Sequence, residues 1–307
     1  MAKSILAIGL NPVLQKTLSF DAFIEGKVNR ATEVHMSSGG KGIHFARAAN
    51  HLGSDSCKVL HFLGGISGES VNGFLEDESI DHEAVPIFDT TRGCTTILSR
   101  ESGLMSELVD PSPRIEASEN EAMLALIEAN LANAEAIAIC GTIPGTIAND
   151  VFSLLIEAAS DDCLLFMDAY TNVAAILESG TVNILKINAD ELSELSGIAD
   201  METAAAHCLE RFSLDALAIT NGPANAVLFT PQKQFEYQLP EIGPIINPLG
   251  AGDTCSGVFV ASFVSGDSIE IAFAKGLAAA SASCLSLKAA DFSLREMTRI
   301  MDGIKIT

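Results

Sequence analysis

Basic residues are scarce in this sequence. It has 18 Lys and Arg against 40 Asp and Glu, which gives a formal net charge of −22 at pH 7. A surface with this charge repels DNA, RNA and anionic lipid, so we expect neither a nucleic-acid nor a membrane partner. It also repels phosphorylated ligands. Any phosphate site must therefore be built locally, from backbone N–H groups and a few placed cations.

Paired cysteine motifs and long hydrophobic runs are missing as well. The seven cysteines are scattered, odd in number and never form Cys-x-x-Cys, which argues against a disulfide framework or a zinc cluster and favours a reduced, cytoplasmic protein. The apolar stretch 257–265 has only nine residues, too few to cross a bilayer. The apolar run 4–10 ends at Asn11-Pro12 without a cleavage site, so we interpret it as a buried first strand rather than a signal peptide.

The sequence alternates short apolar strands with amphipathic helices and has no internal repeat, low-complexity tract or flexible linker. The strands expected at 136–140, 164–167 and 184–187 precede helices expected at 146–159, 171–178 and 189–196. Strands that are apolar throughout are buried on both faces, which is typical of a parallel sheet covered by helices. The pattern predicts an α/β fold with a mostly parallel central sheet.

Two segments break this alternation. Residues 11–38 and 90–109 contain alternating or Thr-rich stretches with hairpin-like spacing, and we expect them to form a small β-lid at the edge of the sheet. The last third returns to helical spacing and predicts helices over 253–265, 268–288 and 293–305.

The segment Asn247-Pro-Leu-Gly-Ala-Gly-Asp-Thr-Cys-Ser-Gly257 leads into an apolar helix. Gly250 and Gly252 permit a turn that aims successive N–H groups at one point, and the helix N-terminus adds partial positive charge there. Asp253 would repel an anion bound at this turn. Either it only caps the helix, or it accepts the proton of a hydroxyl that attacks a phosphoryl group stabilised by Gly250, Ala251 and Gly252.

Two further clusters stand at expected helix starts. Gly39 and Gly40 let the backbone approach a polyhydroxyl ligand, while Lys41 and His44 extend as donors; alternatively, this segment is only a flexible loop. The run 186–191, Lys-Ile-Asn-Ala-Asp-Glu, ends a strand, where α/β sheets bind ligands, or else it is a helix start enriched in acids.

Two common nucleotide motifs are excluded. The dinucleotide fingerprint fails because Cys255 stands where its third Gly belongs, and a Walker A loop fails because Gly42 replaces the required Ser or Thr. The chain is therefore neither a typical Rossmann dehydrogenase nor a P-loop NTPase.

Taken together and in order, these segments resemble the ribokinase/PfkB family of sugar kinases, in particular its phosphofructokinase branch. The motifs that carry the resemblance are Leu10-Asn-Pro12, Glu25-Gly-Lys-Val28, Gly39-Gly-Lys-Gly-Ile43, Thr91-Arg92, Ser106-Glu-Leu108, Gly141-Thr-Ile-Pro-Gly145, Lys186-Ile-Asn188 with Glu191, Thr220-Asn-Gly222 and Gly250-Ala-Gly-Asp253. The resemblance covers almost the whole chain. It implies one ribokinase-like domain over residues 1–307 that uses ATP and Mg²⁺ and has a β-lid, through which a homodimer could form.

The resemblance also implies roles for individual residues. It assigns the general base to Asp253 and the anion hole to the turn before it, and it implies a grip on the substrate phosphate by Arg92, helped by Lys27. A planar bidentate guanidinium suits such an anion. The family's lysine-containing motif makes Asn188 and Glu191 organisers of Mg²⁺, largely through water. The nucleotide-binding residues that it implies are Lys186, Asn188, Thr220, Gly222 and Asn225.

Departures from the family pattern concentrate in the expected sugar pocket. Gln15 stands where the branch usually has Asp, and His44 where it usually has Asn. Pro248 replaces a hydroxyl residue, and Asn225 replaces Gly beside the nucleotide. Neutral drift would explain these changes. The altered donors and acceptors at Gln15 and His44 favour changed sugar specificity instead.

The leading hypothesis is phosphoryl transfer from MgATP to a sugar phosphate such as fructose 1-phosphate, fructose 6-phosphate or tagatose 6-phosphate. A kinase for an unphosphorylated sugar or nucleoside is a rival, but it would leave Arg92 without an anion to pair with. A non-catalytic sensor of the same fold is a second rival, against which the intact Asp253 and Glu191 argue.

Overall fold

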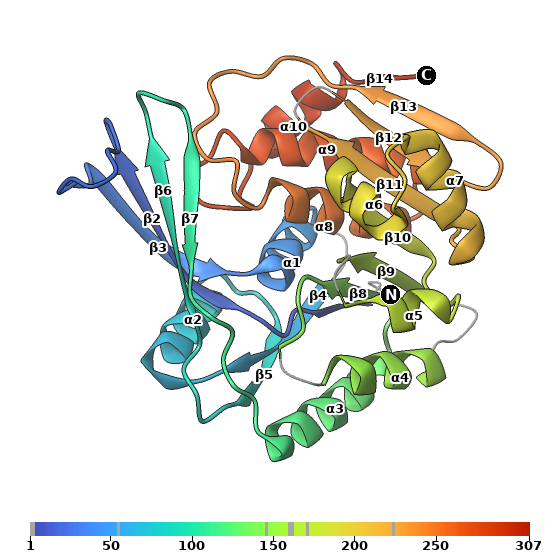
Figure 1. Cartoon of the computed structure of the whole chain (residues 1–307), viewed down its shortest axis with the longest axis horizontal. Coiled ribbons are helices and arrows are strands. Elements are labelled where there is room, and N and C mark those ends of the chain that lie inside the picture. The colour runs from blue at the N-terminus through green and yellow to red at the C-terminus, as the bar shows by residue number, and fades with distance from the viewer. Residues whose placement is uncertain (1–3, 54–55, 145–146, 159–162, 170–171, 223–224) are drawn as a thin grey trace.

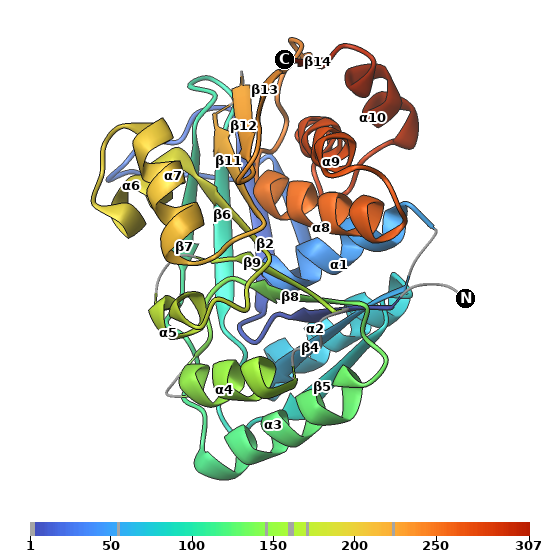
Figure 2. The ribbon, with the colours of Figure 1, turned by 90° about the vertical axis from the view of Figure 1, so that its right-hand side faces the viewer.

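The computed structural model describes residues 4–53, 56–144, 147–158, 163–169, 172–222 and 225–307. These residues form a ten-stranded sheet with helices on both faces and a separate four-stranded sheet at one side (Figures 1 and 2). This is the α/β fold that the alternation of apolar strands and amphipathic helices predicts.

The large sheet is parallel over most of its width. Its strands are β1 (Ser4–Ile8), β4 (Ser56–Leu63), β5 (His82–Pro86), β8 (Ala136–Cys140), β9 (Leu164–Asp168), β10 (Ile184–Asn188), β11 (Ala216–Asn221), β12 (Asn225–Phe229), β13 (Gln234–Gln238) and β14 (Lys305–Ile306). They lie in the order β14-β13-β12-β11-β10-β9-β8-β1-β4-β5. The pairings from β5 to β11 are parallel, and those among β11, β12, β13 and β14 are antiparallel.

Two groups of helices pack against this sheet from opposite sides (Figure 2). The first group comprises α1 (Lys41–His51), α2 (Gly65–Asp77), α8 (Ala251–Val264), α9 (Ile269–Ser283) and α10 (Leu294–Met301). The second comprises α3 (Ala117–Leu131), α4 (Ala148–Ala158), α5 (Ala174–Glu178), α6 (Ala189–Ser196) and α7 (Met201–Arg211).

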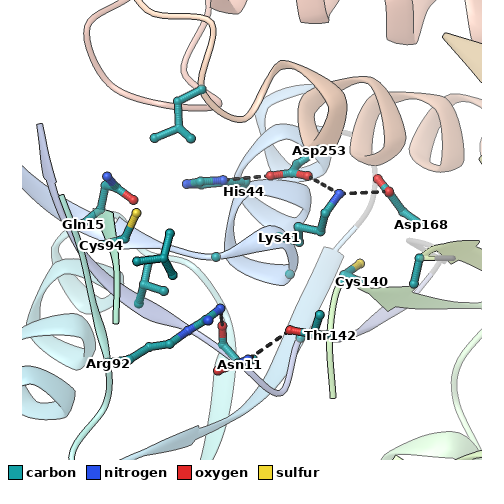
Figure 3. Close-up of a pocket in the computed structure, with 18 of the residues that line it drawn as sticks. Asn11, Gln15, Lys41, His44, Arg92, Cys94, Cys140, Thr142, Asp168 and Asp253 are labelled. Atoms are coloured by element: carbon teal, nitrogen blue, oxygen red, sulfur yellow. Dashed lines mark hydrogen bonds and ion pairs between the residues drawn. The ribbon is translucent and has the colours of Figure 1, made fainter. Parts of the chain in front are cut away.

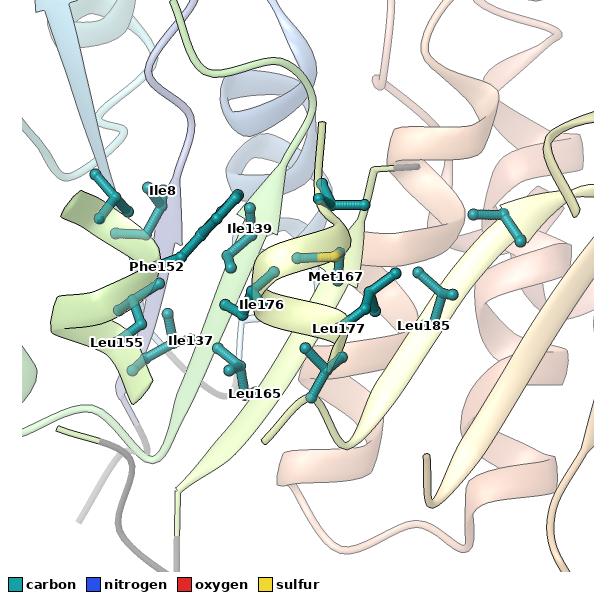
Figure 4. Packing of buried hydrophobic residues seen from close by; sticks show 14 of the residues in the cluster. Ile8, Ile137, Ile139, Phe152, Leu155, Leu165, Met167, Ile176, Leu177 and Leu185 are labelled. Atoms are coloured by element: carbon teal, nitrogen blue, oxygen red, sulfur yellow. The ribbon is translucent and has the colours of Figure 1, made fainter. Parts of the chain in front are cut away.

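The central strand β8 shows why its sequence is apolar at every position. Ile137 and Ile139 pack on the side of α4, against Phe152 (Figure 4), whereas Ala136 and Ala138 belong to the core on the side of α1 and α8. All its residues are buried, and burying one large aliphatic side chain contributes about 1.5–3 kcal/mol. The small residues face α8, which therefore approaches the sheet closely.

The four-stranded sheet is built from the two segments that we expected to form a lid. Its strands are β2 (Val13–Phe20), β3 (Glu33–Gly39), β6 (Gly93–Ser99) and β7 (Met105–Val109), in the order β3-β2-β6-β7. Because side chains alternate along a strand, Gln15, Cys94 and Glu107 share one face of this sheet and line a common cavity. Met36 and Leu108 belong to the other face, where both are exposed.

Two helices near the C-terminus are shorter than the sequence predicts. The helix expected over 268–288 ends at Ser283, because the carbonyl oxygen of Cys284 accepts hydrogen bonds from the N–H groups of Ile246 and Asn247. The helix expected over 293–305 ends at Met301, and the chain then pairs with β13 as β14. The expected helix ends at 146, 159 and 171 lie outside the described residues.

Candidate active site

The turn before α8 has the conformation that its glycines permit. Gly250 adopts a left-handed φ of 75°, and α8 begins at the next residue. In the described part of the chain, the N–H groups of Gly252 and Asp253 donate to no protein acceptor. Unpaired N–H groups at a helix N-terminus form a site for an anion, which is the arrangement expected of Gly250, Ala251 and Gly252.

Asp253 does not cap its own helix, because its carboxylate makes side-chain contacts instead (Figure 3). One oxygen lies 3.3 Å from Nζ of Lys41, and the other lies 2.9 Å from Nδ1 of His44. Burial alone would raise the pKa of this carboxyl group, but Lys41 and His44 outweigh it and hold the pKa far below its usual range. Asp253 is therefore a buried carboxylate that keeps its charge.

A second buried carboxylate, Asp168, lies beside the first. Asp168 follows the apolar run of β9, and one oxygen is 3.1 Å from Nζ of Lys41 while the other is 3.2 Å from Nζ of Lys186. The hydroxyl of Ser256 donates to it at 2.6 Å. Despite burial, these partners lower the pKa of Asp168, and the two carboxylates raise the pKa of Lys41. The four charged groups of Lys41, Lys186, Asp168 and Asp253 thus form one alternating network.

Close packing of α1 and α8 brings this network together. A Cβ atom on Gly257 of α8 would stand 2.3 Å from the carbonyl oxygen of Phe45 in α1, so only Gly allows this approach. A Cβ atom on Gly42 would stand 2.5 Å from Cα of Gly9, at the end of β1. The start of α1 therefore lies tightly against both the sheet and α8, which places Lys41 and His44 beside Asp253.

A cavity of about 370 Å³ opens between this network and the four-stranded sheet (Figure 3). The residues that line it are Gly9, Asn11, Val13, Gln15, Gly40, Lys41, Gly42, His44, Arg92, Cys94, Glu107, Val109, Cys140, Gly141, Thr142, Asp168, Ala169, Glu191, Leu249 and Asp253. Three polar atoms of these residues are buried without a hydrogen-bond partner in the described structure: Oδ1 of Asn11, Nε2 of His44 and Nε of Arg92. Buried polar atoms normally have partners, so these three mark where a polar ligand would bind.

The residues expected to contact a sugar divide into two sets. Gln15, Gly40, Lys41, His44 and Arg92 line the cavity, and Gly39 lies against Gln15 in the neighbouring strand. The amide of Gln15 donates to the hydroxyl of Thr96 at 2.8 Å. Lys27 is exposed in the connection between β2 and β3 and does not line the cavity.

The expected nucleotide-binding residues follow the carboxyl ends of neighbouring strands. Lys186 and Asn188 end β10, and Asn188 pairs in register with Thr220 of β11. Gly222 has a left-handed φ of 67° after β11, and Asn225 begins β12. These residues continue the sheet edge that carries Asp168. The ligand-binding interpretation of the 186–191 cluster is therefore compatible with its position.

Asn188 and Glu191 also cap α6, so both interpretations of that cluster hold in part. Oδ1 of Asn188 accepts from the N–H of Glu191 at 2.9 Å, and Glu191 accepts from the N–H of Asn188 at 2.8 Å. Among the described residues no group of three or more His, Cys, Asp and Glu could hold a metal ion. Glu191 nevertheless lines the cavity, and this sparse oxygen set fits a magnesium ion that keeps most of its water.

Several lining residues were not singled out from the sequence as site residues. Asp168 is the most important, and the available signal was an acid directly after a buried parallel strand. Asn11 donates from its side chain to Ser112 and Thr142 at 2.9 and 3.0 Å, across segments far apart in the chain. Cys94 and Glu107 face the cavity from the four-stranded sheet, and the register that brings them there is not readable from either strand alone.

The protein resembles solved structures over nearly its full length. Phosphofructokinase-2 from Escherichia coli, in complex with substrates and products, superposes with a TM-score of 0.87 at 24% identity, covering 97% of this chain and 98% of that one. Arabidopsis thaliana ribokinase, complexed with ribose and ATP, superposes with a TM-score of 0.75 at 19% identity, covering 98% and 99%. These similarities confirm the ribokinase-like fold.

Sequence comparison identifies the family. The 1-phosphofructokinase of Bacillus subtilis is 26% identical over 292 residues, covering 92% of this chain and 93% of that protein. The tagatose-6-phosphate kinase of Staphylococcus epidermidis is 24% identical over 264 residues, covering 83% and 84%. The family model described as pfkB family carbohydrate kinase matches residues 3–296. The resemblance carried by the ordered motifs is confirmed, and the chain belongs to the pfkB family of carbohydrate kinases.

Proposed function

We propose that this carbohydrate kinase transfers the γ-phosphoryl group of MgATP to a hydroxyl group of a sugar phosphate. The observation that carries the proposal is a single cavity with Arg92 on one side and Asp253, at the start of α8, on the other (Figure 3). The relatives named 1-phosphofructokinase and tagatose-6-phosphate kinase make fructose 1-phosphate and tagatose 6-phosphate the first substrates to test, with fructose 6-phosphate beside them.

Arg92 is the residue that favours a phosphorylated substrate. Its Nε is buried without a partner in the described structure, while one terminal nitrogen donates to the carbonyl oxygen of Asn11 at 3.3 Å. A guanidinium group in this state gains charge-assisted hydrogen bonds from a phosphate, whereas a neutral sugar would leave it without an anion. The sugar hydroxyls would then face Asn11, Gln15 and His44.

The opposite side of the cavity provides the phosphoryl-transfer groups. The unpaired N–H groups of Gly252 and Asp253 stabilise negative charge on the transferring phosphoryl group, and deprotonation of the acceptor hydroxyl depends on Asp253. Lys41 and Lys186 hold the buried carboxylates in place and add positive charge beside the same turn.

The nucleotide would lie along the carboxyl edge of β10, β11 and β12, against Lys186, Asn188, Thr220, Gly222 and Asn225. Asn188 and Glu191 would hold Mg²⁺ through its water ligands, and the ion would neutralise phosphate charge when bound. Supporting this placement, Glu191 lines the same cavity as Asp253.

A homodimer through the lid and a cytoplasmic location complete the proposal. The outer face of the four-stranded sheet carries three exposed apolar side chains: Val34 (56%), Met36 (43%) and Leu108 (60%). A second copy of the chain would cover them. The seven cysteines are free, which suits a reducing compartment, and none of the described helices is long and apolar enough to span a membrane.

The test is release of ADP over a panel of sugar phosphates, free sugars and nucleosides, with Asp253→Asn as the control. We expect sugar-phosphate-dependent ADP release by the native protein and a kcat lower by about 10²–10⁴ in the variant, the usual effect of losing general-base catalysis. Turnover only with unphosphorylated acceptors would support the rival kinase, and ATP binding without turnover on any acceptor would support the sensor.

A further inference from the structure

His44 has an imidazole ring with two different surroundings. Nδ1 lies 2.9 Å from a carboxylate oxygen of Asp253, whereas Nε2 is buried and has no partner in the described structure. The ring extends from Asp253 into the cavity, on the side of Gln15 (Figure 3). A buried nitrogen without a partner, in a residue that lines the cavity, is available to a bound ligand.

The contact with Asp253 determines which nitrogen carries hydrogen. The other oxygen of Asp253 faces Lys41, so the carboxylate keeps its charge and only accepts hydrogen bonds. Nδ1 must then be the donor, which leaves the lone pair of the neutral ring on Nε2. The pairing thus presents a basic nitrogen, rather than an N–H donor, to the cavity.

His44 also lies directly against the phosphoryl-stabilising turn. A Cβ atom on Gly250 would be 3.1 Å from Nδ1 of His44, and Asp253 follows that turn in the first residues of α8. A hydroxyl group bound between the turn and the sugar-facing residues would therefore meet Nε2 as well as the carboxylate. The residue usual at this position of the family pattern, Asn, has no basic nitrogen.

We infer that Nε2 of His44 takes the proton from the acceptor hydroxyl, while Asp253 orients the ring and stabilises the imidazolium ion that forms. This inference rests on the proposed kinase function and refines the part of Asp253 in it. The hydroxyl O–H bond breaks and its proton goes to Nε2, as the oxygen forms a bond to the γ-phosphorus atom. The bond from that phosphorus to the bridging oxygen breaks and leaves its electron pair on ADP; the imidazolium ion then returns the proton to water.

The decisive variant is His44→Asn, which keeps an amide donor for Asp253 and removes the basic nitrogen. At saturating MgATP and sugar phosphate we expect kcat to fall about 10²–10⁴-fold, with the KM for ATP changed less than about threefold. The matched control is His207→Asn, the same change at an exposed histidine of α7, and it should leave both constants unchanged.

Rescue separates a lost proton acceptor from a disturbed fold. In His44→Ala, added imidazole should restore part of kcat in a concentration-dependent manner and should have no effect on the native enzyme. A native-like kcat in His44→Asn, with only the sugar KM altered, would overturn the inference and make His44 a specificity residue. Failure of imidazole to rescue a folded His44→Ala would also count against it.

A measurement on the native protein needs no variant to fold. The ¹⁵N chemical shifts of His44 in the sugar-free protein should show hydrogen on Nδ1 and a bare Nε2; hydrogen on Nε2 alone would refute the inference. If the native protein releases no ADP with any acceptor, the proposed function fails first. ADP release with an unimpaired His44→Asn would leave the kinase function intact and remove only the role of His44.

Discussion

At the scale of single residues, the site depends on charged groups that lie together although they are distant in sequence. Asp168 and Asp253 are separated by 85 positions, and Lys41 contacts both. Motif reasoning singled out Lys41 and Asp253 because each stands beside glycines at a helix start. It did not single out Asp168, because one acid after an apolar strand has no local feature that distinguishes it from a turn residue.

Arg92→Ala tests the substrate phosphate. Losing a charge-assisted pair costs about 1.5–3 kcal/mol, so the KM for the sugar phosphate should rise roughly 10- to 150-fold while the KM for ATP stays near its native value. Steady-state kinetics with both substrates varied would show this. Arg100→Ala, at an arginine exposed near the other end of β6, is the matched control. Unchanged constants in Arg92→Ala would mean that no phosphate binds there.

Asp168→Asn tests the buried network through stability. The change leaves Lys186 buried beside an uncharged amide, and removing one partner of a buried ion pair costs about 3–5 kcal/mol. The native pKa of Asp168 is lowered, so its contribution is complete above the unfolded pKa and is lost as pH falls through the lower, folded pKa. Urea unfolding from pH 7 to pH 3 should show a gap between native and variant proteins that narrows in acid. A gap that is constant with pH would contradict this assignment.

At the scale of elements, the helix and strand pattern was readable where periodicity was strong. The strands at 136–140, 164–168 and 184–188 agree with their apolar runs to within one residue. The helix expected over 268–288 was too long because tertiary hydrogen bonds to Cys284 end it, and such bonds have no signature in helical periodicity. Likewise, β14 exists only through pairing with β13.

The close approach of α1 and α8 makes Gly257→Ala an informative change. The added methyl group would lie 2.3 Å from the carbonyl oxygen of Phe45, so the helices must separate, at a cost of about 1–3 kcal/mol. Gly73→Ala is the opposite control: Gly73 lies within α2 with nothing within 4 Å of an added Cβ, and Ala should stabilise it by up to about 1 kcal/mol. Thermal unfolding of both variants gives the two signs. A neutral Gly257→Ala would show that the helices are not tightly packed.

At the scale of the whole molecule, family membership followed from the order of the motifs rather than from any one of them. Each glycine cluster alone is compatible with a loop or a cap, but their sequence along the chain matches a single fold. The lid segments were recognisable from alternating and Thr-rich residues. Which face of the lid meets the cavity depends on strand register, and neither segment alone determines it.

Met36→Glu tests the assembly proposed through the lid. The outer face of the four-stranded sheet should lie between two copies, so a charge placed there should shift the protein from dimer to monomer in sedimentation or light scattering. Phe88→Glu is the control, since Phe88 is 96% exposed in the connection between β5 and β6. A native protein that is already a monomer at micromolar concentration would rule out this assembly.

The buried charge network has a consequence for how fast an anionic substrate arrives. Lys41 and Lys186 are balanced by Asp168 and Asp253, so this part of the site has no net charge of its own, while the whole molecule carries −22. A phosphorylated ligand therefore approaches against a repulsive field and is attracted only at short range. Added salt screens that field over about 8–10 Å at moderate ionic strength. The association rate constant for the sugar phosphate should consequently rise with salt, opposite to the trend of an enzyme with a basic funnel.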